Sequence, residues 1–340
     1  MGRQAARQVL VIKLGALGDM IQTLAPFAQI RRAHPDAQIT LLTTPPFEAL
    51  ARSSGLFDAV RTDGRPQGAA AHLRLFAALR RARFDRVYDL QTSGRTKNYI
   101  FGFWPRPPQW SGISPGASHR QTRGDRDAMH NLDRMADQLH VAGIGPAYGP
   151  GEAPAPDLGF LVEAARGQGA PTAARFGLAA PFALLIPGAS PVKPQKFWPV
   201  HSYAALAAGL AGSGLQVAVV GGAGEGPLAA TVAQGATGAA DLTGRTSLSD
   251  LAGLAAEAAL VVGNDTGPTH LAAYAGAPGL MLMSRVSDPA HCGPRARMQT
   301  LRSADLADLA PAAVLAALKT QGLLGRRRLK RPPRSPAAAP

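Results

Sequence analysis

Cysteine is almost absent from this 340-residue sequence, and long hydrophobic runs are absent altogether. The single cysteine, Cys292, excludes a disulfide framework within the chain and any zinc cluster built from cysteines. The apolar runs, such as 9–12 and 279–283, are far shorter than the ~20 residues that a membrane-spanning helix needs. The segment from Met1 to Lys13 also lacks the apolar core of a signal peptide. These absences lead us to expect a cytoplasmic protein.

Charged residues are sparse, at 17%, whereas hydrophobic residues make up 46% of the chain, which excludes a wholly disordered protein. The 38 glycines and 29 prolines follow no triplet period, so the sequence is not collagen-like. The length is that of two domains of roughly 100–200 residues each.

The net charge of +14 is unevenly distributed along the chain. Residues 1–150 hold 20 basic and 11 acidic residues, and residues 151–325 hold 10 and 11. The tail, 326–340, holds six basic residues and no acidic one, and its composition predicts disorder. A basic half attracts anionic partners such as nucleic acid, an acidic membrane surface or a phosphorylated substrate. The alternative is a solvated surface that is merely rich in arginine.

Aliphatic runs alternate with helix-like stretches through both halves of the chain, which predicts parallel sheets covered by helices on both faces. The strands expected are 9–13, 38–43, 84–90, 182–186, 216–220, 260–262 and 280–283. The helices expected are 20–32, 69–83, one beginning at 96–103, 129–142, 200–211, 228–234, 249–258, 269–275 and 314–320.

A stretch rich in proline and glycine, residues 145–157, separates the two series and predicts a linker. The fold class expected is therefore α/β, with two Rossmann-like, doubly wound parallel sheets. We expect one domain at 1–150, a second at 151–325 and the basic tail at 326–340. Ligands of such sheets bind at the carboxyl ends of the strands, so a cleft between the two domains is the expected site.

The first candidate motif follows the first strand as Gly15-Ala16-Leu17-Gly18-Asp19. It is not the Gly-x-Gly-x-x-Gly dinucleotide fingerprint, although Gly15 and Gly18 would let a ligand approach the backbone. Asp19 lies where a helix should begin. It is either a first-turn carboxylate that complements the helix dipole or a general base at the mouth of the cleft.

The second motif follows a buried strand as Pro187-Gly188-Ala189-Ser190, with Lys193 and Lys196 shortly after it. Backbone N–H groups and an ammonium group there could share the charge of a diphosphate. The alternative is an exposed loop whose lysines are solvated. Trp198, before Pro199, is expected to pack or to shape the turn.

The third motif joins a strand directly to a helix as Gly263-Asn264-Asp265-Thr266-Gly267-Pro268-Thr269-His270. The free N–H groups of the helix start and the Thr266 hydroxyl could bind an anion. The alternative is an ordinary turn from strand to helix with a purely structural role, in which Asp265 or Thr266 is the N-cap. His270 alone is more typical of a structural histidine.

Two further patterns are only weak indications of a metal site. Asp125-Arg126-Asp127 spells Asp-x-Asp, a pattern of metal-dependent sugar transferases, but no hydrophobic strand precedes it, so we expect a loop and no metal. His291 and Cys292 are adjacent but lack spaced partners for a metal site.

Taken together, the three motifs resemble glycosyltransferase family 9, the bacterial lipopolysaccharide heptosyltransferases and their relatives. The matching stretches are 11–24, then 187–190 with 196–199, and last 263–273, in this order over about residues 8–300. The resemblance implies a GT-B fold with an N-terminal acceptor domain and a C-terminal nucleotide-sugar domain. It implies inverting, metal-independent transfer without any cofactor beyond the sugar nucleotide.

The resemblance also implies roles for individual residues. Asp19 would be the catalytic base, and Lys196 would contact the phosphates of the donor, with Lys193 as the less well matched alternative. The remaining donor contacts implied are Ser190 (phosphate or sugar), Glu225 (nucleoside), Asp265 (sugar), Thr266 and Gly267 (diphosphate), and His270 (no assigned role).

The partners implied are a nucleotide sugar, ADP-heptose by family precedent, and a phosphorylated glycolipid acceptor at the inner face of the inner membrane. No specific nucleic acid is implied. Two other classes stay open: a protein that binds nucleic acid or an anionic surface, and a GT-B epimerase or hydrolase that acts on a nucleotide sugar.

Overall fold

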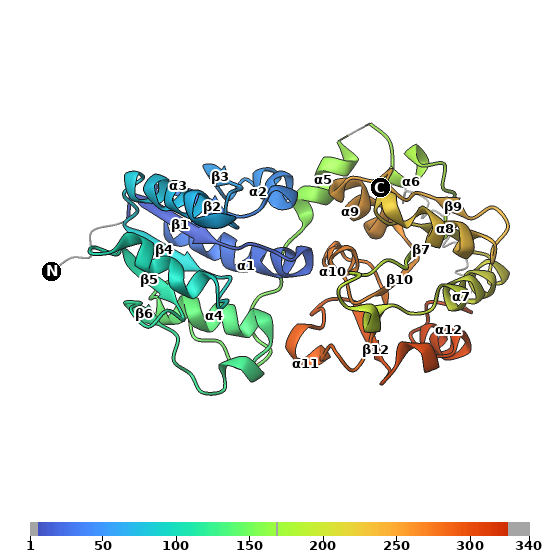
Figure 1. Cartoon of the computed structure of the whole chain (residues 1–340). Helices are drawn as coiled ribbons and strands as arrows, with labels where there is room; N and C mark the ends of the chain where they lie inside the picture. The colour runs from blue at the N-terminus through green and yellow to red at the C-terminus, as the bar shows by residue number, and fades with distance from the viewer. Residues whose placement is uncertain (1–5, 168, 326–340) are drawn as a thin grey trace, which may run out of the picture.

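The computed structural model describes residues 6–167 and 169–325, which form two six-stranded parallel sheets (Figure 1). The first sheet has the order β3-β2-β1-β4-β5-β6 and the second the order β12-β11-β10-β7-β8-β9. Counted from its own first strand, each half has the order 3-2-1-4-5-6 that is typical of doubly wound nucleotide-binding folds. The predicted pair of doubly wound sheets is therefore confirmed. The boundary at residue 150 stays a prediction, and the predicted tail lies outside the described residues.

The strands of the first sheet are β1 (Gln8–Ile12), β2 (Gln38–Leu42), β3 (Ala59–Arg61), β4 (Arg86–Asp89), β5 (Gln109–Gly112) and β6 (His119–Arg120). Those of the second are β7 (Phe182–Ile186), β8 (Gln216–Val219), β9 (Ala240–Asp241), β10 (Leu260–Asn264), β11 (Gly279–Met283) and β12 (Met298–Arg302).

The helices of the first half are α1 (Leu17–Ala33), α2 (Glu48–Ser53), α3 (Gly68–Arg81) and α4 (Asn131–Val141), with the 3₁₀ helices η1 (Pro45–Phe47), η2 (Thr96–Phe103) and η3 (Arg126–Ala128). Those of the second half are α5 (Gly159–Arg166), α6 (Thr172–Arg175), α7 (Val200–Gly212), α8 (Gly226–Ala233), α9 (Leu248–Glu257), α10 (Gly267–Tyr274), α11 (Pro289–Cys292) and α12 (Pro311–Thr320), with η4 (Pro194–Lys196), η5 (Ala223–Glu225) and η6 (Leu306–Asp308).

Alternate residues of β1 belong to different cores, because successive side chains of a strand point to opposite faces. Leu10 and Ile12 pack with α3 and η2, whereas Val9 and Val11 pack with α1 and α4. Helices therefore cover both faces of the sheet, which explains why its central strands are apolar on both sides (Figure 1).

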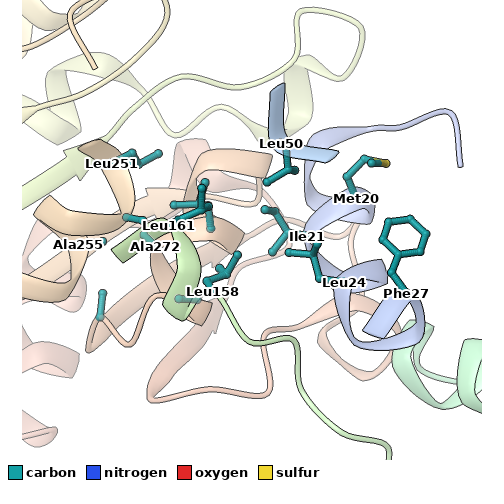
Figure 2. Packing of buried hydrophobic residues seen from close by; sticks show 14 of the residues in the cluster. Met20, Ile21, Leu24, Phe27, Leu50, Leu158, Leu161, Leu251, Ala255 and Ala272 are labelled. Carbon is teal, nitrogen blue, oxygen red and sulfur yellow. The ribbon is translucent and has the colours of Figure 1, made fainter. Parts of the chain in front are cut away.

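The two halves share one apolar core. Helices α1 and α10 lie against each other between the sheets, and α5 packs on α9 (Figure 1). Figure 2 shows residues of α1 and α2 on one side of this core and residues of the second half on the other. The labelled side chains are Met20, Ile21, Leu24, Phe27, Leu50, Leu158, Leu161, Leu251, Ala255 and Ala272. The N-terminal ends of α1 and α10 are thereby held at the boundary between the halves.

Some elements differ from the prediction. The helix expected to begin at Thr96 is a 3₁₀ helix, and its C-cap residue Trp104 already has an extended-type ψ before the prolines that follow. Strands β3, β5, β6, β9 and β12 were not predicted, because they are two to five residues long and several hold Gln, Ser, Gly or Arg. In the described ranges, no helix is long and apolar enough to cross a membrane.

Candidate active site

A cleft of about 660 Å³ opens where the two halves meet, at the carboxyl ends of the strands. The first half lines it with the start of α1, and the second half with the loops after β7, β8, β10 and β11. Nearly all of the predicted site residues line it, namely Gly18, Asp19, Ser190, Lys193, Lys196, Glu225, Asp265, Thr266, Gly267 and His270. The cleft therefore lies at the switch point of each sheet, next to β1 in one half and to β7 and β10 in the other.

Two glycines let the N-terminal turns of α1 and α10 touch across this cleft. A Cβ at Gly18 would lie 3.0 Å from Cδ2 of His270, and a Cβ at Gly267 would lie 2.5 Å from Cβ of Leu17. Any other residue at Gly267 would push the two helices apart, since real Cβ atoms do not approach that closely. The glycines that the sequence placed beside a ligand thus also hold the two halves together.

Gly15 is the predicted candidate that does not line the cleft. It has φ of +109°, a conformation that favours glycine, and a Cβ at this position would overlap the ring of Phe47. Its role is to turn the chain from β1 into α1, so Gly15 supports the position of Asp19.

Asp19 lies in the first turn of α1, half-buried, and faces the cleft. Its Oδ2 accepts a hydrogen bond of 3.2 Å from the backbone N–H of Ala16, the N-cap residue. The capping interaction considered from the sequence is therefore present. A carboxylate has room for several more hydrogen bonds, so this contact leaves Asp19 able to accept a proton from a ligand in the cleft.

Asp265 is the centre of a buried polar cluster on the opposite wall. Its carboxylate forms an ion pair with Lys196, accepts a hydrogen bond of 2.5 Å from the Ser287 hydroxyl and lies 3.2 Å from Nε2 of His270. Since a carboxylate only accepts, Nε2 of His270 carries the proton of that contact. The carboxylate thus fixes the positions of three side chains that line the cleft.

The pKa of Asp265 reflects two opposed effects. Burial alone would raise the pKa of this carboxyl, but the hydrogen bond from His270 and the charge of Lys196 outweigh burial and hold the pKa well below its usual range. Asp265 is therefore an anion at neutral pH.

The structure separates the two candidate lysines. Lys196 is half-buried and reaches both the carboxylate and, at 3.4 Å, the backbone oxygen of Asp265, which leaves ammonium capacity for a ligand. Lys193 is exposed on the same cleft wall. Trp198 is 1% exposed and donates from Nε1 to the Leu309 oxygen at 2.8 Å, so the prediction that it packs is confirmed.

Two predicted hydroxyl groups also face the cleft. Ser190 is exposed in the loop after β7. Thr266 is the N-cap residue of α10, but its side chain forms no cap hydrogen bond there and lies 3.3 Å from the Thr269 hydroxyl. The Thr266 hydroxyl therefore stays available to a ligand at the helix N-terminus.

Glu225 lines the cleft from the segment that follows β8. Its Oε2 accepts a hydrogen bond of 2.8 Å from the N–H of Gly222. A Cβ at Gly188 or at Gly221 would overlap this carboxylate, so both glycines make room for it. Glu225 therefore packs against the loop after β7, through Gly188, and against the loop after β8, through Gly221.

Sequence reasoning missed other residues of the cleft. Ser287 is 5% exposed in the loop after β11, a strand end that carries no recognisable motif. Gln22 and Asn131 come from the first half, and Asn131 donates to Gln22 Oε1 at 3.0 Å. The one available signal was the polar Gln22 within the apolar start of α1.

The segment that follows β11 also joins the two halves. Gln22 donates to the Cys292 oxygen at 3.0 Å, and His130 Nε2 lies 2.9 Å from the Gly293 oxygen. Arg295 forms a bidentate ion pair with Asp133 at 2.5–2.6 Å. These contacts fix the second half against α4 and α1.

The Asp-x-Asp pattern does not line the cleft, whereas His291 and Cys292 do. Asp125 pairs with Arg123 and Asp127 with Arg126, in and beside a short 3₁₀ turn. Across residues 6–167 and 169–325, no group of three or more His, Cys, Asp or Glu side chains could hold a metal ion.

Comparison with known proteins gives related matches. The family described as glycosyltransferase family 9 (heptosyltransferase) matches residues 150–311. Lipopolysaccharide heptosyltransferase 2 of Escherichia coli (strain K12) is 28% identical over 293 residues, which cover 80% of this chain and 81% of that protein.

Solved structures share the fold. A family 9 glycosyltransferase from Veillonella parvula DSM 2008 has a TM-score of 0.73 and 21% identity, over 93% of this chain and 97% of that one. An Escherichia coli heptosyltransferase solved with ADP has a TM-score of 0.70 and 19% identity, over 92% and 99%. With three motifs in order around one cleft and these matches, the chain is similar to glycosyltransferase family 9 and is a glycosyltransferase with the GT-B fold.

Proposed function

We propose that this glycosyltransferase moves heptose from ADP-heptose to an acceptor of the lipopolysaccharide core type, with inversion and without a metal ion. The observation that carries the proposal is the arrangement of Asp19 on one wall of the cleft and of the Asp265 cluster with the α10 N-terminus on the other. A base and an anion site thus face each other across a space of about 660 Å³. The relatives named for ADP, ADP-heptose and lipopolysaccharide support this choice of donor and acceptor.

On the donor side, the leaving ADP needs its developing negative charge stabilised. The amide groups at the start of α10, the Thr266 hydroxyl and the Lys196 ammonium group can do this together. Glu225, beside Gly188 and Gly221, is placed for the ribose hydroxyls of the nucleoside. Ser190 also lines the cleft and serves as a further phosphate or sugar contact.

His270 supports Asp265 beside the donor sugar. Its Nε2–H is turned to Asp265, and its Nδ1 is buried without a hydrogen-bond partner in the part of the chain that the structure describes. The ring therefore acts through the Asp265 carboxylate that it positions on the wall of the cleft.

On the acceptor side, Asp19 takes the proton from the attacking hydroxyl group as the new bond to the anomeric carbon forms. The bond between that carbon and the ADP oxygen breaks in the same displacement, which inverts the configuration. The acceptor is a phosphorylated glycolipid that the basic first half meets at the cytoplasmic face of the inner membrane.

The test is transfer from ADP-heptose to a delipidated inner-core oligosaccharide in the presence of EDTA, with the product followed by mass spectrometry and NMR. We expect a glycosylated acceptor with inverted anomeric configuration and one ADP for each transfer. Free heptose or an epimerised donor as the product, or loss of transfer with EDTA, would overturn the proposal.

A further inference from the structure

An exposed apolar and basic surface lies on the first half, away from the cleft. We define this outer face by Leu73, Phe101, Trp104, Arg80, Arg83 and Arg106. It lies on α3, η2 and the segments that follow them, on the side of the first sheet opposite to α1 and α4 (Figure 1). We propose that the outer face docks the protein on an anionic phospholipid bilayer.

The apolar part of the outer face consists of three well-exposed side chains on α3, on η2 and at the end of η2. Leu73 is 71% exposed, Trp104 is 68% exposed and Phe101 is 55% exposed. Single exposed hydrophobic residues are ordinary on a protein surface, whereas Trp, Phe and Leu gathered on one face indicate an interaction site. Tryptophan in particular is favoured at the boundary between lipid and water.

Packing between α3 and η2 holds these side chains in one surface. Phe76 lies against Gly102, where a Cβ would overlap its ring, and it packs edge-on against Tyr99. Leu73 and Arg80 flank Phe76 along α3 at spacings of three and four residues, so they lie on the same side of the helix. Phe101 precedes Gly102 in η2, and Trp104 is the C-cap residue of η2.

The arginines surround a hollow of about 260 Å³ lined by Arg80, Arg83, Arg106, Leu79, Phe84, Phe103 and Pro108. Arg80 also donates to the backbone oxygen of Trp104 at 3.0 Å, which connects the basic and apolar parts. A guanidinium group binds phosphate through paired hydrogen bonds, so three of them around one hollow suit a phospholipid headgroup.

The charge of the surrounding chain is of one sign. Residues 64–84 hold five arginines, and residues 90–124 hold five basic residues, without a single Asp or Glu in either segment. A surface of this kind attracts an anionic bilayer, and the apolar side chains then enter the interface. An RNA would also be attracted by the charge and could stack its bases on Phe101 and Trp104, but it offers no apolar layer for Leu73.

The test uses the full chain with vesicles of phosphatidylethanolamine and phosphatidylglycerol, and with phosphatidylcholine vesicles as the neutral comparison. Trp110 and Trp198 are buried, so Trp104 is the tryptophan whose fluorescence should shift to the blue and be quenched by brominated lipid. We expect this signal with anionic vesicles only, and we expect Trp104→Phe to lose it. An unchanged spectrum at saturating anionic vesicles would overturn the proposal.

Charge is tested by the triple variant Arg80→Gln, Arg83→Gln, Arg106→Gln. This variant should weaken vesicle binding about 10²-fold, because each basic residue near an anionic surface contributes about 1 kcal/mol. The matched control removes the same charge from exposed arginines of the second half, as Arg166→Gln, Arg245→Gln, Arg302→Gln. Equal losses in the two variants, or binding that survives in the first and disappears when the chain ends at residue 325, would refute docking by this face. Binding of the wild-type chain to an RNA oligonucleotide but not to vesicles would refute it too.

The inference rests on the proposed function only in that a glycolipid acceptor lies in a bilayer. Transfer to the delipidated oligosaccharide should therefore be unchanged in the triple variant, with an unchanged melting temperature. Vesicle binding that persists while transfer fails leaves the docking inference in place and overturns the proposed function, and the reverse result does the opposite.

Discussion

Lys196 and Asp265, 69 residues apart in sequence, form an ion pair on the wall of the cleft. The pair places an ammonium group beside the N-terminus of α10, where two sources of positive potential act on the same space. A nucleoside diphosphate should bind there even without a metal ion.

The first prediction concerns nucleotide binding. ADP should stabilise the protein more than GDP or UDP, by roughly 2.7 kcal/mol at a concentration 100 times its Kd. Lys196→Ala should weaken ADP binding by about tenfold or more, because a charge-assisted hydrogen bond is lost. Thermal shift and calorimetry measure both effects in the presence of EDTA.

Lys193→Ala is the matched control, since this lysine lies in the same loop but is exposed and has no contact with Asp265 in the described structure. An ADP affinity that falls in Lys193→Ala and is kept in Lys196→Ala would reverse the assignment. Equal stabilisation by all three diphosphates would contradict the preference for ADP.

The sequence was informative where one short stretch determines the local structure. The motifs between strands and helices predicted that Asp19, Lys196, Asp265 and Thr266 line one cleft, and all four do. The prediction was possible because the carboxyl ends of parallel strands lie at the same edge of a sheet. It could not locate Ser287, whose place depends on the path of a loop, or the Arg295–Asp133 pair, which joins residues 162 positions apart. Nor did periodicity separate α-helix from 3₁₀ helix in η2, because both expose similar patterns over eight residues.

A second prediction concerns Asp89, which is the last residue of the central strand β4 and is fully buried. Its Oδ1 accepts from the N–H groups of Gln91 and Thr92 at 3.2 and 3.1 Å. Burial raises the pKa of this carboxyl to about 6, although these hydrogen bonds act in the opposite direction.

Because the pKa is higher in the folded than in the unfolded chain, the contribution of Asp89 to stability is present below about pH 4 and is lost as the pH rises through about 6. Asp89→Asn does not titrate and can keep the amide contacts. The free energy of unfolding of this variant should therefore gain about 2 kcal/mol relative to wild type between pH 4 and pH 7. Urea unfolding at both pH values measures it, with Asp85→Asn, at an exposed carboxylate, as the control. A difference that does not change with pH would contradict the prediction.

A third prediction concerns the ion pair between Arg295 and Asp133, which joins the two halves. Asp133 accepts from both guanidinium nitrogens of Arg295 and also from the N–H of Gly151 at 3.0 Å. Arg295→Ala leaves a nearly buried carboxylate without its cation, which should lower the free energy of unfolding by about 2 kcal/mol. Hydrogen exchange at the amide of Gly151 should become faster.

Arg297→Ala removes an exposed arginine two residues away and should change stability by less than about 0.5 kcal/mol. If Arg295→Ala and Arg297→Ala unfold alike, with equal exchange at Gly151, the ion pair does not stabilise the junction of the halves.

The last prediction concerns Asp19, whose contact with Ala16 N–H is compatible with two different roles. If the carboxylate only caps α1, Asp19→Asn keeps an oxygen acceptor and should alter stability by a few tenths of a kcal/mol with activity nearly intact. If it is the base, Asn cannot take the proton of the acceptor hydroxyl, and the rate should fall by about 10²–10⁴ while ADP still binds. Single-turnover transfer, a melting curve and an ADP titration on the same sample separate the two. We expect a folded enzyme with a reduced rate, because Asp19 faces the cleft opposite the Lys196–Asp265 pair. The anion site does not need the Asp19 carboxylate to bind ADP, so nucleotide binding should persist. A rate close to wild type would refute the base.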